Sequence, residues 1–325
     1  MRLTKHFARI CAGLMLAAFA AAVAAQPTYP DKPIRLITPY PPGGGTTAVA
    51  RLVGQKLTES WGQQVLIDNR PGGNTIIGTD ILAKSQPDGY TLILVISTHV
   101  IVPSLLPVPY DPIKDFAPVA TLGTSDYVLV VHPSVPVGNL KELFALAKTR
   151  PGKLNYGSTG SGGVQHLAVE TMNIMAGITM QHIPYKGSGQ LLPNLIGGEI
   201  QLSMQTPITA IGHIKSGRLK GIAYTGNARL PALPQIPTFA EAGMPGLEVT
   251  WWYGMLAPAG TPRRIIDKLS SEIARVLASP DITERLEALG TDPFISTPAK
   301  FAALLKSDMA KFARTIKAAN IKAVQ

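Results

Sequence analysis

The chain has 325 residues, of which 46% are hydrophobic and 15% are charged, and its formal net charge is +10 at pH 7. This composition excludes an intrinsically disordered chain and is sufficient for one large or two medium domains. Lys and Arg alternate with acidic residues, as in Lys141-Glu142 and Glu284-Arg285, and form no basic block. We therefore expect no binding to nucleic acid.

The first 25 residues have the composition of a secretory signal peptide, with a basic start, an apolar middle and a run of small residues. The 16 residues from Ile10 to Ala25 are shorter than the roughly 20 that a membrane span needs. We expect export and cleavage after Ala24 or Ala25. The single cysteine, Cys11, lies inside this segment, so the mature chain is expected to lack disulfides. Cleavage would remove Arg2, Lys5 and Arg9 and lower the formal net charge of the chain from +10 to +7.

Short apolar segments alternate with helical patterns along the mature chain. Strands are predicted at residues 34–38, 64–68, 91–97, 127–131, 154–156, 180–183, 200–204 and 219–224. Helices are predicted at residues 46–60, 76–85, 140–149, 164–175, 190–196 and 208–215. The tail from Pro262 to Val324 indicates two or three helices, with Gly290 suited to a helix stop. This alternation is typical of an α/β fold with parallel sheets flanked by helices.

Two strand–loop–helix units carry glycine-rich loops. They are "YPPGGGTTAVAR", from Tyr40 to Arg51, and "NYGSTGSGGVQHLAVE", from Asn155 to Glu170. The start of a helix offers unpaired N–H groups and a partial positive charge, and glycine lets a ligand approach the backbone. We therefore predict two lobes whose helix starts face one ligand, a carboxylate held mainly by main-chain N–H groups. The alternative is that the glycines serve only tight turns.

Matches to catalytic and cofactor motifs are weak. Gly43 to Ala48 fits the dinucleotide-binding pattern G-x-G-x-x-A, and Asp68 lies near the position of an acid that would bind the ribose. However, "PYPP" separates the strand from the first glycine, which the pattern places at the tight turn itself. Neither Ser158 nor Ser161 lies in G-x-S-x-G. No two histidines of the mature chain have the i, i+3 or i+4 spacing of metal ligands; they are His99, His132, His166, His182 and His213. We predict no enzyme activity, no cofactor and no metal.

Segments spread over the whole mature chain occur in a characteristic order. They include "PIRLITPYPPGGGTTAVAR", "NRPGG", "PDGYTL", "YDPIKDFAPVA", "VLVVHPSVP", "LNYGSTGSGGVQHLA", "HIPYKG", "HIKSGRLKGIA", "ALPQIPTFAEAGMPG" and "WYGMLAPAGTP". Together they resemble the Bug-type extracytoplasmic solute receptors, the substrate-binding component of tripartite tricarboxylate transporters.

The resemblance implies a two-lobed, Venus-flytrap periplasmic binding protein with parallel or mixed sheets and a ligand cleft between the lobes. Lobe 1 would comprise residues 26–126 and 250–325, and lobe 2 would comprise residues 127–249. It also implies a monomeric periplasmic receptor that captures a small carboxylate and delivers it to a membrane permease. Two alternatives stay open, namely a sensor that presents its ligand to a membrane histidine kinase and an exported enzyme.

The resemblance implies a set of ligand-binding residues, carried over by position. In lobe 1 they are Tyr40, Gly43, Gly44, Thr46, Thr47, Ser97, Thr98 and His99. In lobe 2 they are Ser158, Ser161, Gly162, Gly163, His166, Tyr185 and Gln205.

Thr47 and Gln205 stand where the family commonly has aspartate. A buried acid would favour a ligand ammonium group, so its absence leads to the hypothesis of a carboxylate without an amino group. Alternatively, the aspartate that relatives carry after "GGGT" is only a helix cap, a role that Thr47 also fills.

Overall fold

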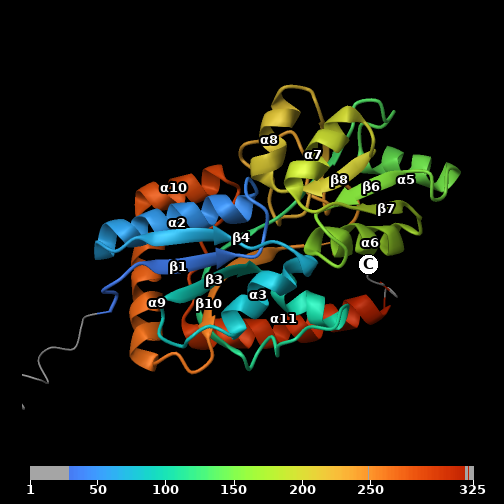
Figure 1. Cartoon of the computed structure of the whole chain (residues 1–325). Coiled ribbons are helices and arrows are strands. Elements are labelled where there is room, and N and C mark those ends of the chain that lie inside the picture. Colours follow the sequence, from blue (N-terminus) through green and yellow to red (C-terminus); the bar gives the residue numbers. More distant parts are fainter. Residues whose placement is uncertain (1–28, 248, 319–320, 322–325) are drawn as a thin grey trace, which may run out of the picture.

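The computed structural model describes residues 29–247, 249–318 and 321. The predicted signal peptide, residues 1–25, and the end of the tail at Val324 lie outside the described residues. Two five-stranded sheets, each with flanking helices, form two units that lie next to each other (Figure 1). Within the described ranges, no helix combines the length and the apolar character needed to cross a bilayer.

Sheet A has the strand order β2-β1-β3-β10-β4. Its strands are β1 (Ile34–Thr38), β2 (Val65–Asn69), β3 (Thr91–Ile96), β4 (Phe116–Ser125) and β10 (Trp251–Pro258). β1 runs parallel to β2 and β3, whereas β10 is antiparallel to both β3 and β4. Helices cover both faces, and β1 and β3 are therefore almost continuously apolar.

The helices of the sheet-A unit fall into two layers. The first layer holds α2 (Gly45–Trp61) and α9 (Arg263–Leu277), which share one apolar core with inward residues such as Leu36. The second holds α3 (Ile76–Ala83) and α11 (Pro298–Ala318), which pack on the opposite residues such as Ile37. Short helical turns follow β2 and β3: η1 (Gly73–Thr75), α4 (Thr98–Ile101) and η2 (Val102–Ser104).

Sheet B has the order β7-β6-β8-β5-β9, with β6 parallel to β7 and β8 and with β5 antiparallel to β8 and β9. Its strands are β5 (Val128–Val131), β6 (Asn155–Ser158), β7 (Gln181–Pro184), β8 (Leu202–Gln205) and β9 (Lys220–Tyr224). Its helices are α5 (Leu140–Thr149), α6 (Val164–Ala176), α7 (Ser188–Gly197) and α8 (Pro207–Lys215).

The chain crosses from sheet A to sheet B between β4 and β5 and returns by β10. Asp126 lies at the first crossing, and its carboxylate accepts hydrogen bonds from Thr250 Oγ1 (2.7 Å) and Tyr224 OH (3.3 Å). The ring of Tyr127 stacks on Trp251 at a centroid distance of 5.7 Å. The two crossing segments are therefore joined to each other directly.

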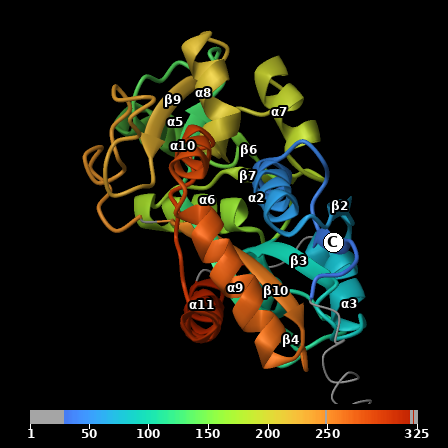
Figure 2. The ribbon, with the colours of Figure 1, turned by 90° about the vertical axis from the view of Figure 1, so that its left-hand side faces the viewer.

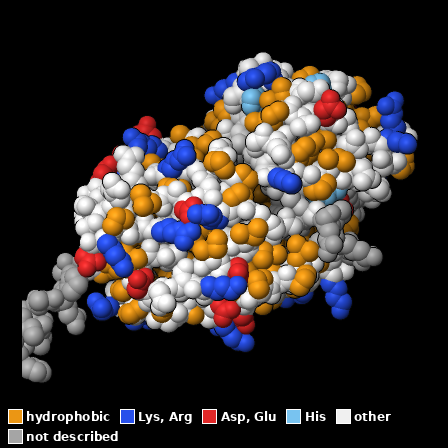
Figure 3. All heavy atoms as spheres, in the orientation of Figure 1, with side chains coloured by type: hydrophobic (Ala, Val, Ile, Leu, Met, Phe, Trp, Pro, Cys, Tyr) orange, Lys and Arg blue, Asp and Glu red, His pale blue; other side chains and the backbone are white. Residues whose placement is uncertain are grey.

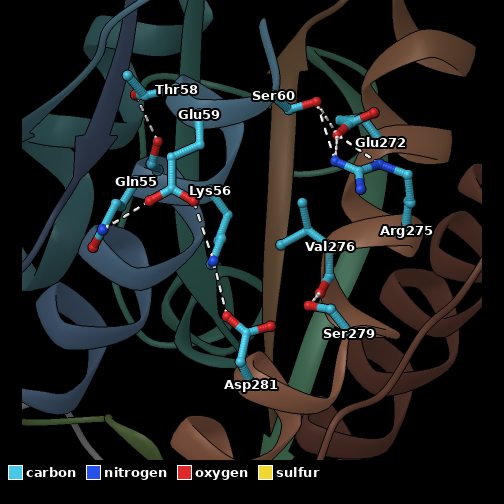
Figure 4. Close-up of polar contacts among 11 residues, drawn as sticks. Gln55, Lys56, Thr58, Glu59, Ser60, Glu272, Arg275, Val276, Ser279 and Asp281 are labelled. Carbon is cyan, nitrogen blue, oxygen red and sulfur yellow. Dashed lines mark hydrogen bonds and ion pairs between the residues drawn. The ribbon is translucent and has the colours of Figure 1, made fainter.

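For the tail, where two or three helices are predicted, the structure has three: α9, α10 (Pro280–Ala288) and α11. Polar contacts join α9 and α10 to α2 (Figure 4): Lys56 Nζ lies 2.8 Å from Asp281 Oδ2, and Arg275 Nη2 donates to Ser60 Oγ at 3.1 Å. Gly290 has φ +66° just after α10, which confirms its place as a helix stop. In the view of Figure 2, α10 lies close to the sheet-B unit, beside α8.

Sequence periodicity missed β4 and β10. Every residue of β10 is buried, so the strand shows no alternation of polar and apolar residues. β4 contains Pro118 and Gly123, which weaken a strand signal. β10 runs against both of its neighbours, β3 and β4, and therefore makes sheet A mixed rather than wholly parallel.

Candidate functional site

Loop 1, residues 40–44, joins β1 to α2 and leaves the start of the helix open. The cap residue Gly44 makes no side-chain cap bond, and the first turn holds no acidic residue. Within the described residues, the N–H groups of Gly45 and Thr46 have no hydrogen-bond partner. A Cβ placed on Gly43 or Gly44 would meet nothing within 4 Å, so the backbone is accessible here. These amides are free to donate to an anion.

Helix α5, which belongs to neither glycine-rich unit, begins differently. Asn139 caps it by accepting a hydrogen bond from the Glu142 N–H at 2.9 Å, and Glu142 places an acidic group in the first turn. This is the usual way in which a protein satisfies a helix start. Other described helices, such as α7, α8 and α9, also begin without a side-chain cap. What α2 and α6 add is a glycine-rich loop that leads directly into the uncapped start.

Asn69, at the end of β2, anchors loop 1. Its Nδ2 donates to Thr38 Oγ1 (2.6 Å), the Tyr40 carbonyl (2.9 Å) and Thr47 Oγ1 (3.0 Å). The Thr47 hydroxyl, in α2, therefore has its hydrogen-bond partner inside the sheet-A unit. The Tyr40 hydroxyl accepts a long bond from the Ile96 N–H at 3.4 Å, and burial raises the pKa of this phenol.

Loop 2, residues 159–163, joins β6 to α6 and is held by its own side chains. Ser158 Oγ donates to the Gly160 carbonyl at 2.9 Å and lies 2.7 Å from His182 Nε2. Gln165 Oε1 accepts from the Thr159 N–H at 2.8 Å. The Ser158 hydroxyl and the Gln165 amide therefore shape the loop.

His166 also shapes loop 2. Its Nδ1 accepts a hydrogen bond from the Gly162 N–H at 2.9 Å, so the neutral ring carries its proton on Nε2. The ring stacks on His182 at a centroid distance of 3.9 Å, and burial lowers the pKa of His166 to about 4. Near neutral pH this residue supplies no positive charge to a ligand.

Ser161 is the polar group in loop 2 that lacks a partner. Its side chain is buried, at 5% exposure, and in the described part of the chain Oγ has no hydrogen-bond partner. The N–H groups of Val164 and Gln165, at the start of α6, also lack partners there, and the cap residue Gly163 makes no side-chain bond. Buried polar groups are rarely left unpaired, so this cluster is suited to a bound oxygen atom.

The residues after β3 are placed together but have different roles. Ser97 Oγ accepts from the Trp252 N–H at 3.2 Å, and Thr98 is buried beside it. His99 packs edge-on against Phe116, and its Nε2 pairs with the Pro112 carbonyl at 2.9 Å. Burial lowers the pKa of His99 to about 4. Its side chain therefore has a structural role, and contact with a ligand remains a prediction.

The two remaining predicted residues lie in the sheet-B unit. Gln205 is buried, its Nε2 donates to Ser203 Oγ at 2.9 Å, and its Oε1 accepts from Thr209 Oγ1 at 3.1 Å. The ring of Tyr185 covers Gly157, where a Cβ would lie 3.3 Å from Tyr185 Cε2. Gln205 thus places a neutral, hydrogen-bonded amide at the position where the family commonly has aspartate.

Both glycine-rich loops contact the opposite unit, because a Cβ added to a glycine on one side would lie close to an atom on the other side. On the loop 1 side, a Cβ on Gly187 would lie 2.9 Å from Pro41 Cγ, and a Cβ on Gly45 would lie 3.5 Å from Ile208 Cγ2. For loop 2, the corresponding distances are Gly160 to Asn74 Oδ1 (2.9 Å) and Gly162 to Leu105 Cδ1 (2.3 Å). Loop 1 thus lies against the starts of α7 and α8, and loop 2 lies against η1 and the end of η2 (Figure 1).

We call this set of contacts the junction. Sequence reasoning missed Asn74, Leu105 and Ile208, because single side chains brought in from the opposite unit carry no motif of their own.

Ionised side chains are absent from both loops. Asp68, the residue considered for a ribose contact, instead pairs with Arg35 Nη2 (2.6 Å) and Arg70 Nε (2.9 Å). In the described ranges, no three His, Cys, Asp or Glu side chains are grouped so that they could hold a metal. On the face shown in Figure 3, Lys and Arg are scattered with Asp and Glu and form no single basic stripe.

Comparison with known proteins agrees with this architecture. Residues 49–321 match the model of the tripartite tricarboxylate transporter family receptor. The chain belongs to this family. The periplasmic binding protein BugD is 32% identical, covers 90% of this chain and 99% of its own, and superimposes with a TM-score of 0.85.

Two structures of relatives contain a ligand. A protein of R. palustris solved with adipate is 32% identical, with a TM-score of 0.88 over 91% of this chain and 100% of its own. MatC of Rhodopseudomonas palustris, with bound malate, is 28% identical, with a TM-score of 0.82 over 89% and 100%. The predicted fold class is therefore confirmed, and this receptor is a periplasmic solute-binding protein of the Bug type.

Proposed function

We propose that this receptor captures a small organic acid without an amino group in a cleft between the two units and delivers it to a tripartite tricarboxylate-type permease. The uncapped, uncharged starts of α2 and α6, together with the unpartnered Ser161 hydroxyl, carry this proposal. The proposed lobes are residues 26–126 with 250–325, and residues 127–249. Each contributes one glycine-rich loop to the binding site.

The available donors are sufficient for useful affinity. Gly45 and Thr46 offer N–H groups on one side, and Val164, Gln165 and the Ser161 hydroxyl offer donors on the other. A hydrogen bond to a charged group contributes about 1.5–3 kcal/mol. Three or four such bonds supply roughly 5–10 kcal/mol before the costs of association, and micromolar binding requires about 8 kcal/mol. No arginine is needed.

The absence of an amino group follows from the charge of the site. Thr47 is neutral and bonded to Asn69, and the amide of Gln205 is satisfied by Ser203 and Thr209. Neither position offers a carboxylate to an ammonium group. A ligand ammonium would lose its water without gaining a charged partner, which is costly.

Isothermal titration of the mature protein tests the proposal with matched ligand pairs. We expect glutarate, adipate or malate to bind with micromolar or tighter dissociation constants. Glutamate, which differs from glutarate only by its amino group, should bind at least tenfold more weakly. Tight binding of glutamate alone would refute the amino-group hypothesis, and a failure of every carboxylate would refute the function. The permease can be tested by crosslinking the loaded receptor in membranes that carry the transporter.

A further inference from the structure

The turn η1 presents a second unpartnered hydroxyl at the junction. Thr75 is buried, at 7% exposure, and in the described chain its Oγ1 has no hydrogen-bond partner. Thr75 directly follows Asn74, whose Oδ1 lies 2.9 Å from a Cβ placed on Gly160 of loop 2. Thr75 from the sheet-A unit and Ser161 from the sheet-B unit are thus next to the same inter-unit contact, and both have unsatisfied buried hydroxyls.

The backbone of η1 is unfavourable for the residues it contains. Asn74 has φ 52° and ψ 48°, and Thr75 has φ +80° and ψ −9°, both in the left-handed region. Asparagine tolerates this conformation, but a β-branched threonine does not adopt it readily. Glycine would satisfy the turn at lower cost but would remove the hydroxyl. Strain of this kind is characteristic of positions where a side chain has a further role.

We infer that Thr75 is a ligand-binding residue, and that the ligand carboxylate bridges the hydroxyls of Thr75 and Ser161 across the junction. This inference rests on the proposed function and deepens it. A bridging oxygen would satisfy both buried hydroxyls at once, each of which is costly to leave unpaired. Because the two hydroxyls belong to different units, the same bond would stabilise the closed arrangement of the receptor.

Thr75→Val tests this inference because valine keeps the shape and removes only the hydroxyl. The probe is whichever of adipate, malate and glutarate the wild-type protein binds most tightly. We expect the Thr75→Val affinity to fall at least tenfold, with no decrease in the stability of the ligand-free protein, since an unpaired hydroxyl is lost. Thr75→Ser keeps the hydroxyl and should bind within about threefold of wild type.

Thr171→Val is the matched control. Thr171 Oγ1 donates to the Leu167 carbonyl within α6 at 2.7 Å, so this hydroxyl is already satisfied, and we expect unchanged affinity. A second check is the Thr75→Val/Ser161→Ala double variant, whose loss of affinity should differ from the product of the single losses if both hydroxyls hold one carboxylate.

Thr75→Val with wild-type affinity would overturn the inference while leaving the proposed function intact. A loss of affinity that Thr75→Ser does not rescue, or that is accompanied by a less stable ligand-free protein, would also overturn it by assigning Thr75 a structural role. If wild type binds none of the three acids, the proposed function and this inference fail together.

Discussion

Gly162→Ala separates backbone strain from closure of the junction. Gly162 has φ +76°, and a Cβ placed there would lie 2.3 Å from Leu105 Cδ1, which belongs to the opposite unit. The added methyl group therefore has two consequences. The strained φ is present in every state of the folded protein, whereas the collision with Leu105 occurs only when the units are together.

The two costs can be estimated separately. A non-glycine residue in the left-handed region costs about 1 kcal/mol, which should appear as reduced stability of the ligand-free protein. The Leu105 methyl group must move by about 1 Å to reach ordinary contact distance, and overpacking of this kind costs about 1–3 kcal/mol. If binding requires the closed junction, this second cost lowers affinity about 5- to 150-fold.

Denaturant unfolding measures the first cost, and titration with the tightest-binding dicarboxylate measures the second. Gly177→Ala is the matched control, because Gly177 ends α6 at φ +60° and a Cβ there meets nothing within 4 Å. It should lose about 1 kcal/mol of stability with unchanged affinity. Leu105→Ala should restore binding in the Gly162→Ala background.

Equal affinity losses in Gly162→Ala and Gly177→Ala would refute this reasoning, because they would trace the effect to strain alone. The absence of rescue by Leu105→Ala would likewise show that the Leu105 contact does not govern closure.

Three further predictions concern single residues. Burial lowers the pKa of His99 to about 4, so as pH falls below about 6.5 the unfolded chain binds the proton before the folded protein does, and stability is lost. His99→Phe removes this group and should reduce the stability lost between pH 6.5 and 5 by about 2 kcal/mol, measured by denaturant titration at each pH. An unchanged loss would contradict this. Asn69→Asp cannot donate to the Tyr40 carbonyl and should destabilise the protein by about 1–3 kcal/mol, measured by unfolding, whereas wild-type stability would argue against the anchor. An ionised Glu at position 165, made by Gln165→Glu, cannot donate to the Met204 carbonyl and adds negative charge beside loop 2. The affinity for the dicarboxylate should therefore fall more than tenfold at pH 7 and recover partly at lower pH. A pH-independent affinity of this variant would count against the prediction.

The sequence alone determined the features that depend on neighbouring residues. The predicted bounds of β1 and α5 match the structure at both ends, because hydrophobic periodicity and capping are local properties. The glycine runs at Gly43 and Gly162 likewise marked strand-to-helix turns, since backbone freedom is a property of the residue itself. The family resemblance correctly indicated the fold class.

Only the tertiary structure decided which of these residues face one another. β10 became a strand because β3 and β4 flank it, which its wholly apolar sequence does not reveal. The tertiary structure packs His99 in the core against Phe116, and it places the Thr75 hydroxyl at the junction, where the described chain offers it no partner. Contacts such as that of Gly162 with Leu105 join distant segments. Burial and hydrogen-bond satisfaction depend on such long-range partners, and no local pattern encodes them.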